Sequence, residues 1–179
     1  MSLPPALEVL WRDLESVRAE VLKEVEGLSQ GQADWRPGPE DWSVGEIVHH
    51  LTLAEVATGK LSSKLLKEAG AQAGPFPADL AALNPLPPQP AGPAEAPEGV
   101  RPTWGEPIDR LLSDMKGARE RSRQTLERLA AVDVRAMRWR HGRLGELDVG
   151  QWWTLQAWHD GDHLQQIRTL KGGSGFPRA

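Results

Sequence analysis

Two histidines one helical turn apart are the residues of this sequence best suited to chemistry. The apolar residues that recur around them at the three- and four-residue steps of one helical face are Trp152, Leu155, Ile167 and Leu170. Because residues i and i+4 of a helix point the same way, His159 and His163 can offer two nitrogens to one divalent metal ion. The alternative is a pair of core histidines hydrogen-bonded to protein groups. Asp160 and Asp162, although close in sequence, are expected to point outward.

A third histidine lies far upstream on another predicted buried stripe. Ser43 and Glu46 form an S-x-x-E capping box that predicts the start of a helix. His50 follows the apolar series of this helix, whereas His49 is rotated by about 100° towards its flank or surface. The stripe of this helix continues through Ile47, Leu51, Ala54, Leu61 and Leu65.

Three of the five histidines therefore lie on predicted core stripes. Three neutral imidazoles with open positions on a divalent ion are typical of a catalytic rather than a closed structural site. The competing interpretation is three buried histidines satisfied by Asp, Gln or carbonyl groups, but burying three titratable rings without a purpose is costly. The chain contains no cysteine, so any metal must use imidazole, carboxylate or an external ligand.

Four amphipathic stretches must position these residues. They are predicted as helices over 5–27, from 43 through at least 65, from about 106 to 129, and from 148, with Asp148 as N-cap, to about 170. Residues 28–42 are predicted to be a connection, and a short extended piece is expected at 137–139. The pattern predicts an all-α four-helix bundle, with residues 1–171 as a single domain and 172–179 as a flexible tail.

A proline-rich segment over 71–102 separates the second and third predicted helices. It holds nine of the 15 prolines, so it is not expected to form regular helix or central strand. A connection of this length is either a mobile insertion or a functional element such as a flap over a pocket.

Composition narrows the function classes. The chain has 179 residues and a formal net charge of −4, which disfavours a dedicated nucleic-acid or anionic-membrane binder. The N-terminus lacks the basic and apolar regions of a signal peptide, and nothing resembles a membrane span. We therefore expect a cytoplasmic protein that acts on a small molecule.

Three stretches resemble the DinB-like superfamily, which includes YfiT-like hydrolases and thiol-dependent transferases. Residues 42–51 resemble its W-S-x-x-E-I-x-x-H-L pattern, and residues 159–167 resemble H-x-x-x-H-x-x-Q-I. Residues 141–147 resemble its H-P-x-x-G-x-L turn, with Gly142 where proline is common. Order and spacing agree over roughly residues 5–170.

The resemblance implies a four-helix bundle that binds a divalent metal, zinc or nickel, through His50, His159 and His163. It also implies a homodimer in several members, and often a reaction that joins a low-molecular-weight thiol such as bacillithiol to an electrophile. Three function classes follow: a metal-dependent thiol transferase, a metal-dependent amide or ester hydrolase, and a non-catalytic stress-response protein that binds metal.

Further residues are candidates for supporting roles. Gln166 could orient His163 or a ligand, and Glu46 or His141 could act as an acid or base. Each has a simpler interpretation: a polar residue at the bundle edge, the capping box, and an exposed turn residue. A basic pocket for an acidic thiol would draw on the arginines in predicted connections, namely Arg36, Arg101, Arg140 and Arg143.

Overall fold

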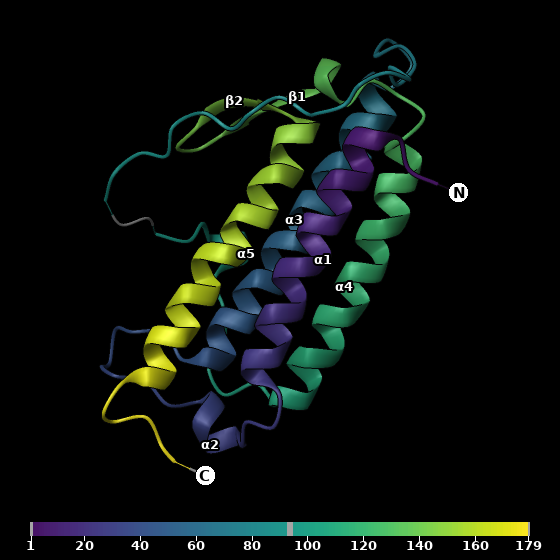
Figure 1. The fold of residues 1–179 in the computed structure, drawn as a ribbon. Helices are drawn as coiled ribbons and strands as arrows, with labels where there is room; N and C mark the ends of the chain where they lie inside the picture. Colours follow the sequence, from purple (N-terminus) through teal and green to yellow (C-terminus); the bar gives the residue numbers. More distant parts are fainter. Residues whose placement is uncertain (1, 93–94, 179) are drawn as a thin grey trace.

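Four long helices lie side by side along the molecule (Figure 1). They are α1 (Pro5–Val25), α3 (Val44–Ala69), α4 (Ile108–Leu129) and α5 (Val149–Gly172). The computed structural model describes residues 2–92 and 95–178, so positions 1, 93, 94 and 179 of the predicted domain, crossover and tail lie outside it. The predicted all-α four-helix bundle is confirmed.

Capping boxes start the two helices that carry the histidines. In α3 the Ser43 side chain accepts from the Glu46 backbone N–H, while the Glu46 side chain accepts from the Ser43 backbone N–H. Asp148 and Gln151 make the same reciprocal pair at the start of α5. Since these bonds satisfy amide groups left open at a helix start, both helices begin where the sequence predicts.

The helix directions explain the long crossover. Figure 1 shows α3 and α4 running in the same direction, with α1 and α5 running the opposite way. After α3 the chain must therefore return along the length of the bundle before α4 can begin. It does so on the outer side of α5. The proline-rich segment is this return path, and it contains the short helix η1 (Glu98–Val100).

Short elements occupy the other connections. The predicted connection over 28–42 contains the one-turn helix α2 (Gln30–Ala33), which has its own capping box. After the short helix η2 (Val134–Ala136), the extended piece predicted at 137–139 becomes a two-stranded antiparallel hairpin, β1 (Arg138–His141) and β2 (Gly145–Asp148). Gly145 has φ of 75°, which L side chains rarely adopt.

Apolar side chains fill the bundle in two clusters. One is centred on Leu14, Leu126 and Trp153, and the other on Ile47, Met115 and Ile167. Among the described residues, no helix is long and apolar enough to cross a membrane.

The buried face of α5 differs from the prediction. The residues expected to point inward include Trp152, Leu155, His159 and His163, but these four are only partly buried. Ile167 and Leu170 of the predicted face are buried, and the other buried side chains include Trp153, Gln156, Asp160 and Leu164. The helix is thus turned by about one residue, and Asp160, expected to point outward, is fully buried. The helix takes this rotation because polar groups of its buried face bond to other helices: Asp160 accepts from Arg18, and Trp153 donates to Ser62.

The C-terminal residues fold back on the bundle. The ring of Phe176 meets Trp35 edge-on at 5.6 Å between centroids, and the Pro177 carbonyl accepts from Gln32. The tail predicted to be flexible from its glycines is therefore held through an apolar ring and one backbone group.

Candidate metal centre

The three histidines on the predicted stripes meet between α3 and α5. Their ligand atoms lie within 4.8 Å of one another, although His50 and His159 are 109 residues apart in sequence. The Nε2 atoms of these two rings are 3.0 Å apart, and the ring centroids of His159 and His163 are 4.6 Å apart. Two helices distant in sequence, α3 and α5, thus bring the triad together.

The opposite ring nitrogens are occupied by protein groups. His50 Nδ1 donates to the Val100 carbonyl at 2.7 Å, and His163 Nδ1 contacts the Gln166 side-chain oxygen at 2.8 Å. Because these oxygens accept, the proton of each ring lies on Nδ1, and its Nε2 has a lone pair that can accept a hydrogen bond or bind a metal ion. Gln166 therefore contacts His163, the ring that it was predicted to orient, and Val100 adds a contact that the sequence did not indicate.

Burial keeps the rings neutral. It lowers the pKa of His50 to about 4 and that of His159 to about 3, with neighbouring imidazoles adding to both effects. Burial also lowers the pKa of His163, although the Gln166 hydrogen bond acts in the other direction. Neutral imidazole is the form that binds metal ions, so the rings are ready for coordination near neutral pH.

This donor set could hold a divalent ion. Two imidazole nitrogens about 2.1 Å from one ion stand about 3.0–3.4 Å apart for bond angles between about 90° and 109°. The 3.0 Å between the Nε2 atoms of His50 and His159 agrees with this range. Without an ion, the same distance fits a hydrogen bond in which neutral His159 donates from Nε2 to His50 Nε2, since His50 holds its own proton on Nδ1. Three imidazoles suit zinc, nickel, copper or iron.

The side chain of Trp42 borders the centre. The Trp42 ring lies 4.8 Å from the His50 ring and is stacked on His163 at 6.0 Å, both between centroids. Trp42 is part of the motif at 42–51, but its contact with two triad rings was not predicted. It covers one side of the site with apolar surface.

Glu46 takes the simpler of its two predicted roles. Its carboxylate accepts from Arg36 Nε at 2.8 Å and from the Ser43 N–H at 2.9 Å. Although burial raises the pKa of Glu46, these donors outweigh it and hold the pKa below its ordinary value. The carboxylate is therefore an anion committed to an ion pair and a helix cap.

His141 lies in the hairpin, and its ring is tilted against that of Trp152 with 5.1 Å between the centroids. Its Nδ1 accepts from the backbone N–H groups of Arg143 and Leu144, both at 3.2 Å. In the neutral ring the proton is then on Nε2, which makes that nitrogen a donor. Burial lowers the pKa of His141, and the Arg143 charge adds to the shift.

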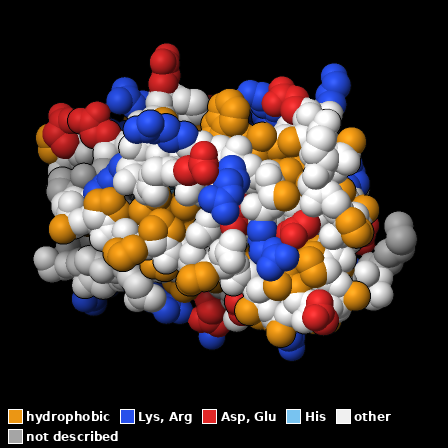
Figure 2. Space-filling model, turned by 90° about the horizontal axis from the view of Figure 1, so that it is seen from above, with side chains coloured by type: hydrophobic (Ala, Val, Ile, Leu, Met, Phe, Trp, Pro, Cys, Tyr) orange, Lys and Arg blue, Asp and Glu red, His pale blue; other side chains and the backbone are white. Residues whose placement is uncertain are grey.

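The arginines expected to form a basic pocket are mostly engaged with the protein itself. Arg36 pairs with Glu46, Arg101 donates to the Ala96 carbonyl, and Arg143 donates to the Pro90 and Gly92 carbonyls. Arg140 is exposed on β1. Seen from the end of the bundle that carries the hairpin, basic side chains are interspersed with acidic and apolar ones (Figure 2).

The crossover is attached to the bundle at several points along its length. Near α5, Gln151 donates to the Pro85 carbonyl and Asn84 donates to Asp148. Nearer the triad, the Thr103 N–H donates to His49 Nδ1 at 3.0 Å. With the Val100 contact to His50, these bonds place the last part of the crossover against the centre.

Comparison with protein families now adds an independent observation. A family model described as the DinB superfamily matches residues 13–167, most of the chain and all three histidines. The chain belongs to the DinB superfamily. The resemblance drawn from the three motifs is thereby confirmed, whereas the metal identity and the reaction are separate questions.

A solved structure supports the fold of this DinB-superfamily chain. The crystal structure of TT2238, a four-helix bundle protein, matches with a TM-score of 0.61 and 15% sequence identity. The match covers 90% of this chain and 96% of the other. A comparison with curated proteins finds no significant match.

Proposed function

We propose that this DinB-superfamily protein is a metal-dependent transferase that joins a low-molecular-weight thiol, of the bacillithiol type, to a small electrophile. One observation carries the proposal. Three neutral imidazoles converge on one point, and two of them are held by Nδ1 contacts that turn Nε2 towards that point. A divalent ion held there lowers the pKa of a coordinated thiol or water by its Lewis acidity.

The residues of the chain supply orientation and shielding. The Val100 carbonyl and Gln166 fix the ring planes of His50 and His163, while Trp42 covers both rings. Apolar cover reduces competition by bulk water and strengthens electrostatic interactions inside the site. These features favour a nucleophile that is bound in a defined place. The electrophile would approach from a side of the centre that Trp42 does not cover.

A thiol is favoured over water because the residues near the centre offer little general base. Glu46 is committed to Arg36, and the neutral His141 presents a donor rather than an acceptor at Nε2. A free thiol has a pKa of about 8.5, far below the value of about 15.7 for water, so it needs much less help to ionise. Hydrolysis of an amide or ester remains the second candidate, with His141 as its acid or base.

Metal content tests the first part of the proposal. Untagged protein is purified without chelators and compared with a His50→Ala, His159→Ala, His163→Ala variant by plasma mass spectrometry. His49→Ala is the matched control, because His49 is the adjacent histidine and lies outside the triad. We expect about one equivalent of metal in the parent and in the control, and none in the triple variant. A parent that carries no metal and takes up neither zinc nor nickel contradicts the proposal.

Thiol binding tests the second part. A cobalt form is titrated with low-molecular-weight thiols while its visible absorption is followed. A thiolate-to-metal charge-transfer band that grows to saturation supports the transferase. An unchanged spectrum, together with turnover of amide or ester substrates, supports the hydrolase instead. An unchanged spectrum without turnover supports a non-catalytic protein.

A further inference from the structure

Four charged side chains meet in the centre of the bundle, one from each long helix. They are Arg18 of α1, Glu55 of α3, Arg119 of α4 and Asp160 of α5, and we call them the ion cluster. All four are buried, and the side chains of Glu55 and Asp160 have no exposed surface. Two positive and two negative charges balance, as burial requires.

The two carboxylates share the same two guanidinium groups. Arg18 Nη2 donates to Glu55 and to Asp160, both at 2.8 Å. Arg119 donates to Glu55 at 2.9 Å and to Asp160 at 3.3 Å. The helices that carry the histidines, α3 and α5, are thus tied to each other through the helices that do not.

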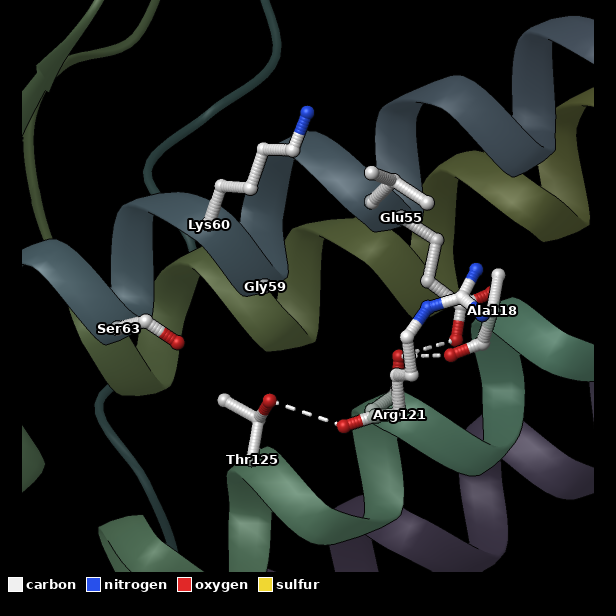
Figure 3. A pocket seen from close by; sticks show the side chains of 9 residues that line it. Glu55, Gly59, Lys60, Ser63, Ala118, Arg121 and Thr125 are labelled. Carbon is white, nitrogen blue, oxygen red and sulfur yellow. Dashed lines mark hydrogen bonds between the residues drawn. The ribbon is translucent and has the colours of Figure 1, made fainter.

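Neutral side chains complete the bonding. Ser122 donates to Glu55 at 2.6 Å, and Gln156 donates to Asp160 at 2.8 Å. Figure 3 shows Glu55 extending from α3 towards α4 near Ala118, at the side of the groove between these helices. Every oxygen of both carboxylates therefore has at least one donor.

Stability alone is a poor explanation for this arrangement. Arg18 Nε and Nη1 are buried and have no hydrogen-bond partner among the described residues. A buried donor without a partner costs about 1–3 kcal/mol, and apolar replacement of a buried ion network is often neutral or stabilising. The best-attested role of such networks is to select one arrangement of helices.

The cluster lies beside the metal centre along both helices. Asp160 directly follows His159, and Glu55 is five residues, about 7.5 Å along the helix axis, from His50. Since neighbouring helix residues are about 100° apart, the direction of Asp160 sets the direction of His159. The rotation of α5 that buries Asp160 is the one that places His159 and His163 on the flank facing His50.

We propose that the ion cluster is a positioning device for the metal centre: by holding Glu55 and Asp160 on shared guanidinium groups, it fixes the rotation of α3 and α5 at which the three histidines converge. This inference shares one premise with the proposed function, namely that the triad holds a divalent ion, and it does not depend on the reaction. An atom about 5 Å from a helix axis moves by about 2 Å when the helix turns by about 20°. Metal–ligand distances tolerate about 0.2 Å, so rotation must be set sharply.

Cobalt binding tests the proposal without reference to activity. Asp160→Asn keeps the size of the side chain but removes the charge that holds α5. We expect the dissociation constant for cobalt to rise at least tenfold, and the visible d–d bands of the bound ion to change, in protein that remains folded by circular dichroism. Leu126→Ala is the control, because it removes an uncharged buried side chain from the apolar cluster around Leu14 and Trp153 and leaves all four charges of the ion cluster in place.

A second variant covers the case in which Asp160→Asn does not fold. Arg18→Met combined with Asp160→Asn removes one charge of each sign and leaves Arg119 paired with Glu55. We expect it to fold and still to bind cobalt at least tenfold more weakly than the parent. Parent-like affinity and spectrum in either folded variant overturn the positioning role and leave the proposed function intact. A parent that binds no cobalt overturns both.

Discussion

His159 and Asp160 are neighbours in sequence, yet their surroundings on α5 are opposite. Asp160 is fully buried, and two guanidinium groups pair with it. His159 is partly exposed, and it is neutral because burial and three other imidazoles lower its pKa to about 3. One region is built from matched charges and the other from rings kept free of charge. The charges around Asp160 balance one another within the protein, whereas the neutral rings around His159 can receive a cation.

The largest effect is expected from breaking the ion cluster on one side. Glu55→Gln removes the carboxylate that accepts from Arg18, Arg119 and Ser122, and leaves an unbalanced buried positive charge. Removing one partner of a buried ion pair costs about 3–5 kcal/mol. We expect a loss of that size in the free energy of unfolding, measured in urea at pH 7.

The pH dependence of the difference in unfolding free energy between the parent and Glu55→Gln shows whether the Glu55 carboxylate causes it. Burial raises the pKa of Glu55, but Arg18 and Arg119 outweigh burial and hold it below the ordinary value of 4.5. The stabilisation is therefore complete above pH 4.5 and disappears as the pH falls through the folded-state pKa. A difference between parent and variant that persists unchanged under strong acid contradicts this assignment.

The metal-free triad is expected to respond to pH in a higher window. The pKa of His50 falls from 6.5 to about 4 on folding, so the unfolded chain takes up the proton first as the pH falls. Stability should be greatest above pH 6.5 and decrease towards pH 4, by about 3 kcal/mol for a fully expressed shift of this size. Urea unfolding of the chelator-treated protein between pH 8 and pH 4 measures this slope.

His50→Gln is the variant that sharpens the measurement, because its side chain does not titrate. Its stability should change less between pH 6.5 and pH 4 than that of the parent. An identical slope in both proteins would show that other groups cause the decrease.

The smallest effect is expected from Gln166. Gln166→Ala leaves the three ligands in place but removes the oxygen that His163 Nδ1 contacts at 2.8 Å. Loss of such an outer contact typically weakens metal binding by about 10–100-fold. Competition with a chromophoric zinc chelator measures the change. Gln165→Ala, one residue away and exposed, is the control and should bind zinc as the parent does.

Local rules predicted much of the fold. The capping boxes at Ser43 and Asp148 identified the starts of α3 and α5, and apolar periodicity identified the four long helices. The same periodicity selected His50, His159 and His163 from five histidines, and the structure brings those three together. These features depend on residues close in sequence, which is why they could be read directly.

The rotation of α5 could not be read from apolar residues alone. Hydrophobic periodicity assigned Trp152 and Leu155 to the core, but the buried face is built around Trp153, Gln156 and Asp160. A signal was present: each long helix carries a charged residue on its apolar stripe, at Arg18, Glu55, Arg119 and Asp160. That four such residues on separate helices satisfy one another is a long-range property, which periodicity within one helix does not report.

The contact between His50 and the Val100 carbonyl also could not be predicted from local sequence patterns. It comes from a backbone carbonyl of the crossover, 50 residues from His50, and a carbonyl has no residue type to recognise. The proline content indicated an irregular segment but gave no information on where its last part would lie.

The distance along the chain between the ligands has a consequence for biosynthesis. His50 and His159 are 109 residues apart, and the crossover that supplies Val100 lies between them. While the chain emerges from the ribosome, most of it is made before the second histidine of the triad exists, so no ion can be captured at full affinity by the growing chain. Metal loading would then follow synthesis and report that the whole bundle, and not only its first half, has closed.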